Sequence, residues 1–97
     1  MPPASRKTDT ASGHDGFPPT TATTGSSDVE INGLPALRLG DAFANHSKPK
    51  HPPHPRALAA GSPTVFINGL PAGRVGDAID CGGTLISGSP DVELDEG

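Results

Sequence analysis

The sequence predicts a small all-β domain built from a repeated β-hairpin, and three observations lead to that prediction. The chain has 97 residues, of which 13 are glycine and 12 are proline, so tight turns must be frequent. No segment has the apolar period of an amphipathic helix. Residues 25–42 and 61–78 are copies of one another, identical at 13 of 18 positions. This repeat argues against a disordered chain, which the composition alone would allow.

Each copy has the pattern of two strands joined by a tight turn. In the first copy, residues 29–31 alternate as a strand does, and Asn32-Gly33 favours a type I′ turn, which needs positive φ at both central residues. Pro35 then begins a second strand, where a missing N–H is tolerated, and Gly40-Asp41 ends it. The residues expected on the core-facing stripe of the copies are Val29, Ile31, Val65, Ile67, Val92 and Leu94.

A third copy is divided between the two ends of the chain. Residues 88–94 match the first half of the unit, and residues 3–9 match the second half. We therefore expect the ends to lie side by side and three quasi-equivalent hairpins to surround one axis. The prediction is a single domain over residues 1–97, a body with pseudo-threefold symmetry.

Three candidate metal ligands fall at nearly the same phase of the repeat. His14, His46 and Cys81 follow the first proline of their Pro-Ala-x-Arg segments by 11, 11 and 10 residues. Pseudo-threefold symmetry would bring them together on the axis, with His54 or His51 as the fourth ligand. Such a set suits one tetrahedral structural Zn²⁺ and leaves no position open for substrate. A plain buried thiol is the alternative for Cys81.

Two further patterns have a structural rather than a chemical explanation. Arg-x-x-Asp recurs in all three copies, which favours turn capping and local ion pairing over catalysis. The tract at residues 48–55 contains four prolines and predicts a stiff connection that positions a ligand, rather than a polyproline motif for a recognition domain.

Charge and cysteine content exclude several functions. A net charge of −4 with scattered basic residues argues against a nucleic-acid partner. No apolar run is long enough to cross a bilayer, and the start of the chain is unlike a signal peptide. The single cysteine excludes an internal disulfide, so a metal ion or oligomerisation must supply the stabilisation that a small core lacks.

The three Pro-Ala-x-Arg segments and the run Gly61–Asp77 resemble the proline-alanine-alanine-arginine (PAAR) repeat family over essentially the whole chain. The third motif position departs from the name, with Ser5, Leu37 and Gly73. The resemblance implies a zinc-stapled cone of short β-strands, with zinc held by three histidines and one cysteine. It favours His54 as the fourth ligand, because Pro53-His54 matches the family's Pro-His step, and leaves His51 as the fallback.

The resemblance also implies a function. Such cones cap the trimeric β-helical VgrG spike of type VI secretion systems, or the equivalent spike of contractile phage tails, and these two settings stay open. We expect a monomeric, non-enzymatic tip that is made in the cytoplasm and exported at the spike's end or carried in a virion tail. It would touch the target membrane transiently, and any effector would dock as a separate protein. A zinc hydrolase is the remote alternative, but no candidate general base accompanies the ligands.

Overall fold

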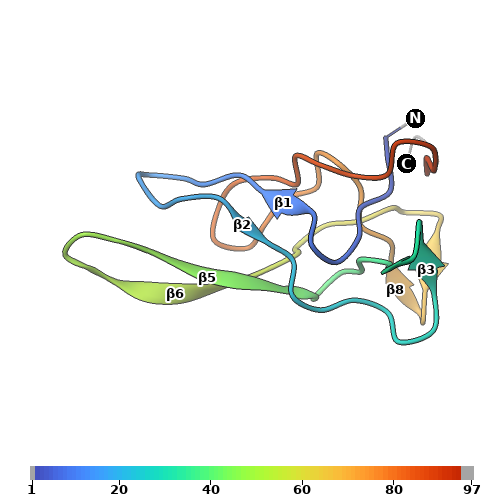
Figure 1. The fold of residues 1–97 in the computed structure, drawn as a ribbon, viewed down its shortest axis with the longest axis horizontal. Coiled ribbons are helices and arrows are strands. Elements are labelled where there is room, and N and C mark those ends of the chain that lie inside the picture. The colour runs from blue at the N-terminus through green and yellow to red at the C-terminus, as the bar shows by residue number, and fades with distance from the viewer. Residues whose placement is uncertain (1, 95–97) are drawn as a thin grey trace.

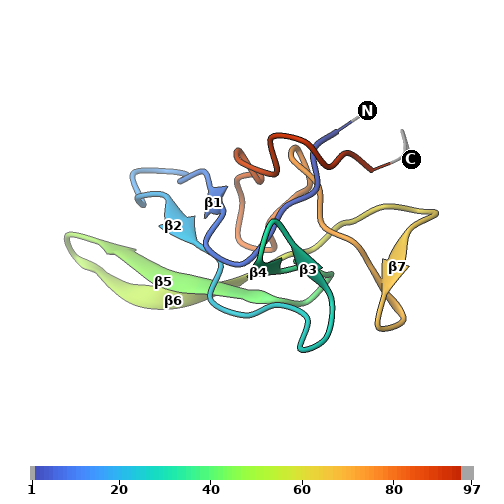
Figure 2. The same cartoon turned by 45° about the vertical axis from the view of Figure 1, so that its right-hand side comes forward.

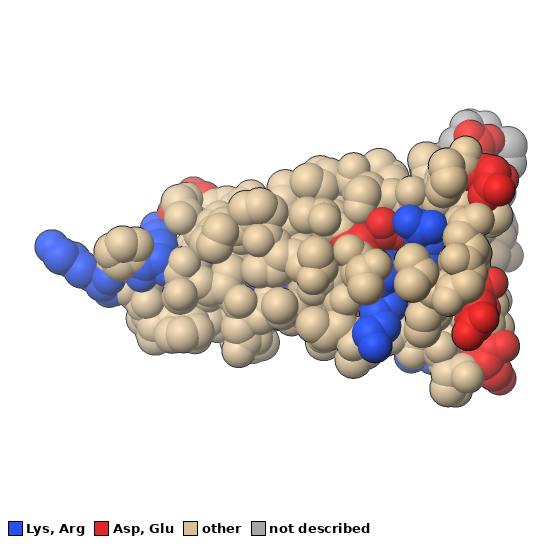
Figure 3. Space-filling model, in the orientation of Figure 1, with Lys and Arg blue, Asp and Glu red and all other residues tan. Residues whose placement is uncertain are grey.

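The computed structural model describes residues 2–94, which form strands and turns but no helix, and hence none that could span a membrane. The predicted all-β fold is confirmed, while Met1 and residues 95–97 of the predicted domain lie outside the described residues. The body measures 40 × 24 × 23 Å and tapers from a wide end to a narrow one (Figure 3). Its strands are β1 (Thr10–Ala11), β2 (Thr20–Thr21), β3 (Glu30–Ile31), β4 (Leu34–Pro35), β5 (Ala42–Lys48), β6 (His51–Ala57), β7 (Phe66–Ile67) and β8 (Leu70–Pro71).

The two intact copies form the predicted hairpins at the wide end, β3–β4 and β7–β8 (Figure 1). Asn32 and Gly33 have φ values of 55° and 79°, and Asn68 and Gly69 have 55° and 78°. Positive φ at both central residues is the requirement of a type I′ turn, so the Asn-Gly prediction is confirmed. Each strand is only two residues long because the chain leaves the hairpin to pair with another copy.

The Pro-Ala-x-Arg segments pair with one another in a closed ring. The N–H of Ser5 donates to the carbonyl of Gly73 (3.0 Å), that of Gly73 to Leu37 (2.8 Å), and that of Leu37 to Ser5 (3.1 Å). Each segment donates to one of the other two and accepts from the other, so the three segments close around one axis. The ring is therefore the centre of the pseudo-threefold arrangement.

The first and last described residues complete a third hairpin-like pair. Pro3 pairs with Glu93, and the N–H of Ala4 donates to the carbonyl of Val92 at 3.0 Å. The intact copies make the same bond at 2.9 and 3.0 Å, from Ala36 to Val29 and from Ala72 to Val65. Figures 1 and 2 show these first and last segments side by side at the wide end.

The repeated Arg-x-x-Asp acts as a local cap. In the second segment, Asp41 is 6% exposed and accepts from the Arg38 backbone N–H and from its guanidinium. The same bonds link Arg6 to Asp9 and Arg74 to Asp77. The structural explanation of this motif is thereby confirmed.

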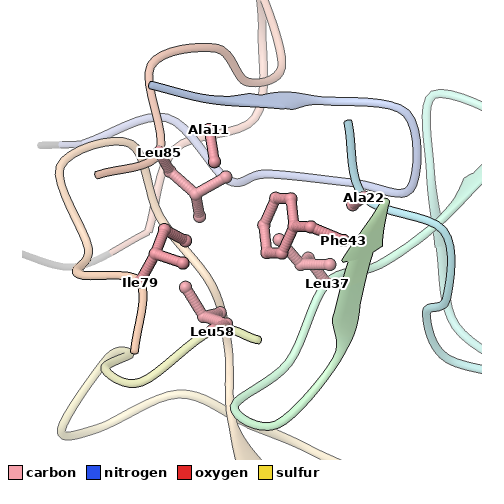
Figure 4. Close-up of a cluster of buried hydrophobic side chains, with 7 residues drawn as sticks. All are labelled: Ala11, Ala22, Leu37, Phe43, Leu58, Ile79 and Leu85. Atoms are coloured by element: carbon pink, nitrogen blue, oxygen red, sulfur yellow. The ribbon is translucent and has the colours of Figure 1, made fainter. Parts of the chain in front are cut away.

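The main core lies where three arms leave the ring: residues 12–21, 44–57 and 80–84, called here the first, second and third arms. Each arm joins the next through one bridge, and the three bridges are Ala22–Phe43, Leu58–Ile79 and Leu85–Ala11. These six residues and Leu37, all buried, make up the cluster in Figure 4. The core therefore consists of the three bridged pairs that join neighbouring arms, packed around the side chain of Leu37.

A smaller core holds the hairpins. Ile67 packs with Ala36 and Ala72, and Ile31, Val65 and Leu94 are partly buried against them. Val29, which we expected on this stripe, directly precedes β3 and is 37% exposed, so it lies outside the smaller core.

The tract at residues 48–55, which we expected to be a stiff connection between arms, instead forms the end of β5, the turn and most of β6 in one hairpin. The tract nevertheless positions a candidate ligand, His54, as expected. β5–β6 is a two-stranded sheet with two register shifts, so prolines can occupy positions where no N–H is needed. The hairpin reaches the narrow end of the body (Figure 1).

Each Asn of the type I′ turns also ties its copy to a neighbour. The amide of Asn68 accepts from Ser26 (2.6 Å) and Arg38 (3.0 Å) and donates to Asp28 (2.7 Å). This last bond, with one from Ser26, lowers the pKa of Asp28. Asn32 makes the same contacts with Arg6, Ser89 and Asp91.

Replacing Asn68 is expected to separate the two roles of this residue. Asn68→Gly keeps the positive φ but loses the inter-copy bonds, which should lower the free energy of unfolding by about 1–3 kcal/mol. Asn68→Ala also strains the turn and should cost about 1 kcal/mol more. Urea denaturation measures both, and two variants as stable as the parent chain would contradict the assigned contacts.

Candidate metal centre

Four candidate ligands meet between the core and the narrow end. The ligand atoms of His14, His46, His54 and Cys81 all lie within 4.8 Å of one another. His14 comes from the first arm, His46 and His54 from the second, and Cys81 from the third. The structure therefore groups the four residues that the sequence nominated, and this set can hold a metal ion.

The core sets the height at which the ligands lie. Ala11, Phe43 and Ile79 are the buried residues at which the chain enters each arm, and a candidate ligand follows them by three, three and two residues. Equivalent exits from one ring thus place equivalent side chains on the axis. This is why candidate ligands at nearly the same phase of the repeat lie at the same height.

The fourth ligand breaks the symmetry. His54 lies directly across from His46 in the β5–β6 pairing, so one hairpin presents two imidazoles side by side, with ring centroids 4.3 Å apart. The second arm is the longest of the three, and it contains most of the β5–β6 hairpin, whose strands have seven residues each. Its return strand can therefore supply a ligand that the shorter arms do not.

Each histidine of the cluster has an oxygen near its Nδ1 atom, and Nε2 of His46 faces the sulfur of Cys81. The Nδ1 of His46 donates to the carbonyl of Pro18 at 2.8 Å, because a carbonyl can only accept. His54 Nδ1 lies 3.4 Å from the Pro55 carbonyl, and His14 Nδ1 lies 3.6 Å from the carboxylate of Asp15. A second partner at Nδ1 fixes the tautomer and orientation of a metal-binding imidazole.

Two observations fit a metal better than an empty cluster. The Nε2 atom of His14 is buried and has no hydrogen-bond partner among residues 2–94, an arrangement that is costly unless something binds there. Burial lowers the pKa of His46, and the charge of Arg56 adds to this, although the bond to Pro18 opposes it. A neutral ring is the form that binds metal.

The donor set suits tetrahedral zinc, and one of its donor–donor distances matches such a site. Cys81 Sγ lies 3.7 Å from His46 Nε2. In a tetrahedral site, Zn–S and Zn–N bonds of about 2.3 and 2.0 Å place such atoms about 3.5 Å apart. Three imidazoles and one thiolate would complete the coordination, and the ion would supply a cross-link between the arms.

Sequence reasoning missed the residues that enclose this centre. Phe17 packs on the rings of His46 and His54, with centroids 4.8 and 4.5 Å away, and Lys48 lies over its other side. Gly82 and Gly83 follow Cys81, and a Cβ on Gly83 would lie 2.6 Å from the carbonyl of Ser12. The pair Gly82-Gly83 was a readable signal of close approach, whereas nothing in the pattern distinguished Phe17.

His51, the fallback ligand, lies outside the cluster. It is exposed and faces Lys48 near the turn of the β5–β6 hairpin. The two histidines of this tract therefore form a matched pair for assigning the fourth ligand.

We expect His54→Ala to bind zinc at least tenfold more weakly than the parent chain, because one of four donors is lost. His51→Ala should bind zinc unchanged. Competition with a chromophoric chelator measures both affinities. The opposite ranking would move the fourth ligand to His51.

Comparison with known proteins places this geometry in a family. A family model described as the PAAR motif matches residues 12–87 of the 97-residue chain. No curated protein matches the sequence closely enough to count as a relative. The matched region contains all four candidate ligands and both intact copies of the repeat.

Proposed function

The chain belongs to the PAAR-motif family of structural spike-tip proteins, and from that premise we propose that it caps a trimeric, VgrG-like β-helical spike. The observation that carries the proposal is the closed ring of three Pro-Ala-x-Arg segments. A single chain with three quasi-equivalent faces can match the end of a true threefold trimer, with one hairpin above each spike chain. The domain proposed for this role is the whole of residues 1–97, with the third copy divided between the termini.

The wide end has the features of a docking face. β3 and β7 are each paired on one side, so their other edges can extend the β-structure of a partner. Phe66 on β7 is 56% exposed, and Leu70 on β8 and Val29, just before β3, are each 37% exposed. Exposed apolar groups at strand edges favour a protein partner over solvent. Acidic side chains lie along this end on the face that Figure 3 shows.

The narrow end suits mechanical penetration. It is too thin for a hydrophobic core, so we propose that zinc bound by His14, His46, His54 and Cys81 stiffens it. A contracting apparatus would drive this end through a target membrane with transient contact. In this proposal the protein has no catalytic activity, because four protein ligands leave no zinc position for substrate.

The setting follows from the same role. We propose that the protein is a monomer before assembly, is made in the cytoplasm and leaves at the tip of a contractile injection system, whether secretion system or phage tail. Effectors would dock as separate proteins. No nucleic-acid partner is proposed, given the net charge of −4.

Docking is tested by size exclusion and by titration with a trimeric VgrG-like spike from the same source. Phe66→Glu is expected to weaken the complex by roughly 30-fold or more, because a central aromatic contact is replaced by a charge. Ile86→Glu is the matched control: Ile86 is 54% exposed but lies beside Thr10, away from the β7–β8 hairpin. Equal weakening by both variants, or by neither, would refute this docking face.

A further inference from the structure

Arg56 is a buried cation directly beside the metal centre. It lies on β6, two residues after His54, and is 1% exposed. Its Nε donates to Cys81 Sγ at 3.3 Å. No carboxylate among the described residues is paired with it, so the guanidinium is satisfied by the sulfur and by uncharged oxygens.

Those oxygens belong to the other two arms. Nη1 lies 3.1 Å from the hydroxyl of Thr20, near the end of the first arm, and 3.5 Å from the carbonyl of Ala11, which directly precedes that arm. Nη2 donates to the carbonyls of Ser12 and, at 3.1 Å, Gly82. One side chain of the second arm therefore binds the first and the third arms at once, immediately next to the residues that carry the candidate ligands.

From this geometry we propose that Arg56 is the positioning residue of the metal centre. Its planar fork holds Cys81 Sγ, the adjacent Gly82 carbonyl and the Ser12 carbonyl of the first arm where a metal needs them, and the Nε–H bond to the sulfur persists after the metal binds. The inference rests on the metal centre proposed above and not on docking to a spike. It adds a role to a residue outside the ligand set.

A purely structural role would leave the sulfur unaffected, so the test must include a property of the sulfur itself. Co²⁺ bound by a thiolate has a charge-transfer band whose energy depends on the hydrogen bonds that the sulfur accepts. Removing an N–H···S bond raises the energy of the sulfur electrons and moves the band to longer wavelength. Packing damage elsewhere does not move it.

The experiment compares the Co²⁺ forms of the parent chain, Arg56→Met and Thr20→Val. Arg56→Met is expected to bind Co²⁺ about 10–100-fold more weakly, the range typical of outer-shell changes, with its band at longer wavelength. Thr20→Val removes one acceptor of the same guanidinium but not the sulfur bond, so its band should stay in place. Unchanged affinity and band position in Arg56→Met would overturn the proposal.

A second measurement covers the case in which Arg56→Met does not fold. In the ¹¹³Cd-loaded parent chain, the Nε–H proton of Arg56 should exchange slowly with solvent and show scalar coupling to cadmium through the sulfur. A rapidly exchanging proton without that coupling would overturn the proposal. A parent chain that binds neither Co²⁺ nor Cd²⁺ would instead refute the metal centre itself, so the two failures are distinguishable.

Discussion

Replacing Cys81 with alanine is expected to abolish stoichiometric zinc binding and to cause the largest loss of stability of any single ligand substitution. The thiolate is the one anionic donor of the set, and the cross-link between the third arm and the other two depends on it. A metal ion that binds only the folded state, at a free concentration about 1,000-fold above its Kd, stabilises that state by about 4 kcal/mol. For a domain of this size that corresponds to a fall in Tm of roughly 15–30 °C.

Metal analysis of the purified chain and thermal unfolding followed by circular dichroism check this result. A chelator should lower the Tm of the parent chain toward that of Cys81→Ala, and added zinc should restore the parent chain alone. Cys81→Ala with an unchanged zinc content would reject the assignment of this ligand.

The second large effect is expected at the axis of the ring, where Leu37 fills the space that three equivalent positions share. Ser5, Leu37 and Gly73 occupy the third motif position of the three copies, and all are buried. A Cβ on Gly73 would lie 3.3 Å from Leu37 Cβ and 2.8 Å from the end of Leu58. The axis therefore has room for one large side chain and two small ones.

Leu37→Ala should lower the free energy of unfolding by about 2–5 kcal/mol, because Leu37 is 0% exposed and the rigid ring cannot collapse onto the cavity. Gly73→Ala should destabilise the parent chain but cost less in the Leu37→Ala background, because the Leu37 methyl group 3.4 Å from the new Cβ is then absent and the end of Leu58 can move into the emptied space. Urea denaturation of the double-mutant cycle measures this coupling. Additive effects would show that the two positions do not share the axis.

The parts that the sequence predicted are those that repetition makes visible. Asn32-Gly33 and Asn68-Gly69 recur at the same place in the two intact copies, and their tolerance of positive φ allowed the type I′ turns to be predicted. His14, His46 and Cys81 were found because symmetric arms deliver their residues to one height. That these residues bind metal stays a prediction, although the structure brings them together with His54.

The parts that could not be predicted are those in which one copy departs from the others. The β5–β6 hairpin has longer strands than the pairings of the other arms, and its return strand comes from a tract that we expected to connect arms. Arg56 and Phe17 act through contacts with other arms, and neither position is repeated along the chain. Leu37 was noted only as a departure at the third motif position, but its large side chain fills the axis of the ring.

The central claim is that one chain presents three equivalent faces to a trimer and is stiffened by one ion. Native mass spectrometry of the complex with a VgrG-like spike tests it most directly, because mass resolves protein and metal stoichiometry together. The account predicts three spike chains, one copy of this chain and one zinc ion. A complex with three copies of this chain, or a single copy without bound metal, would contradict it.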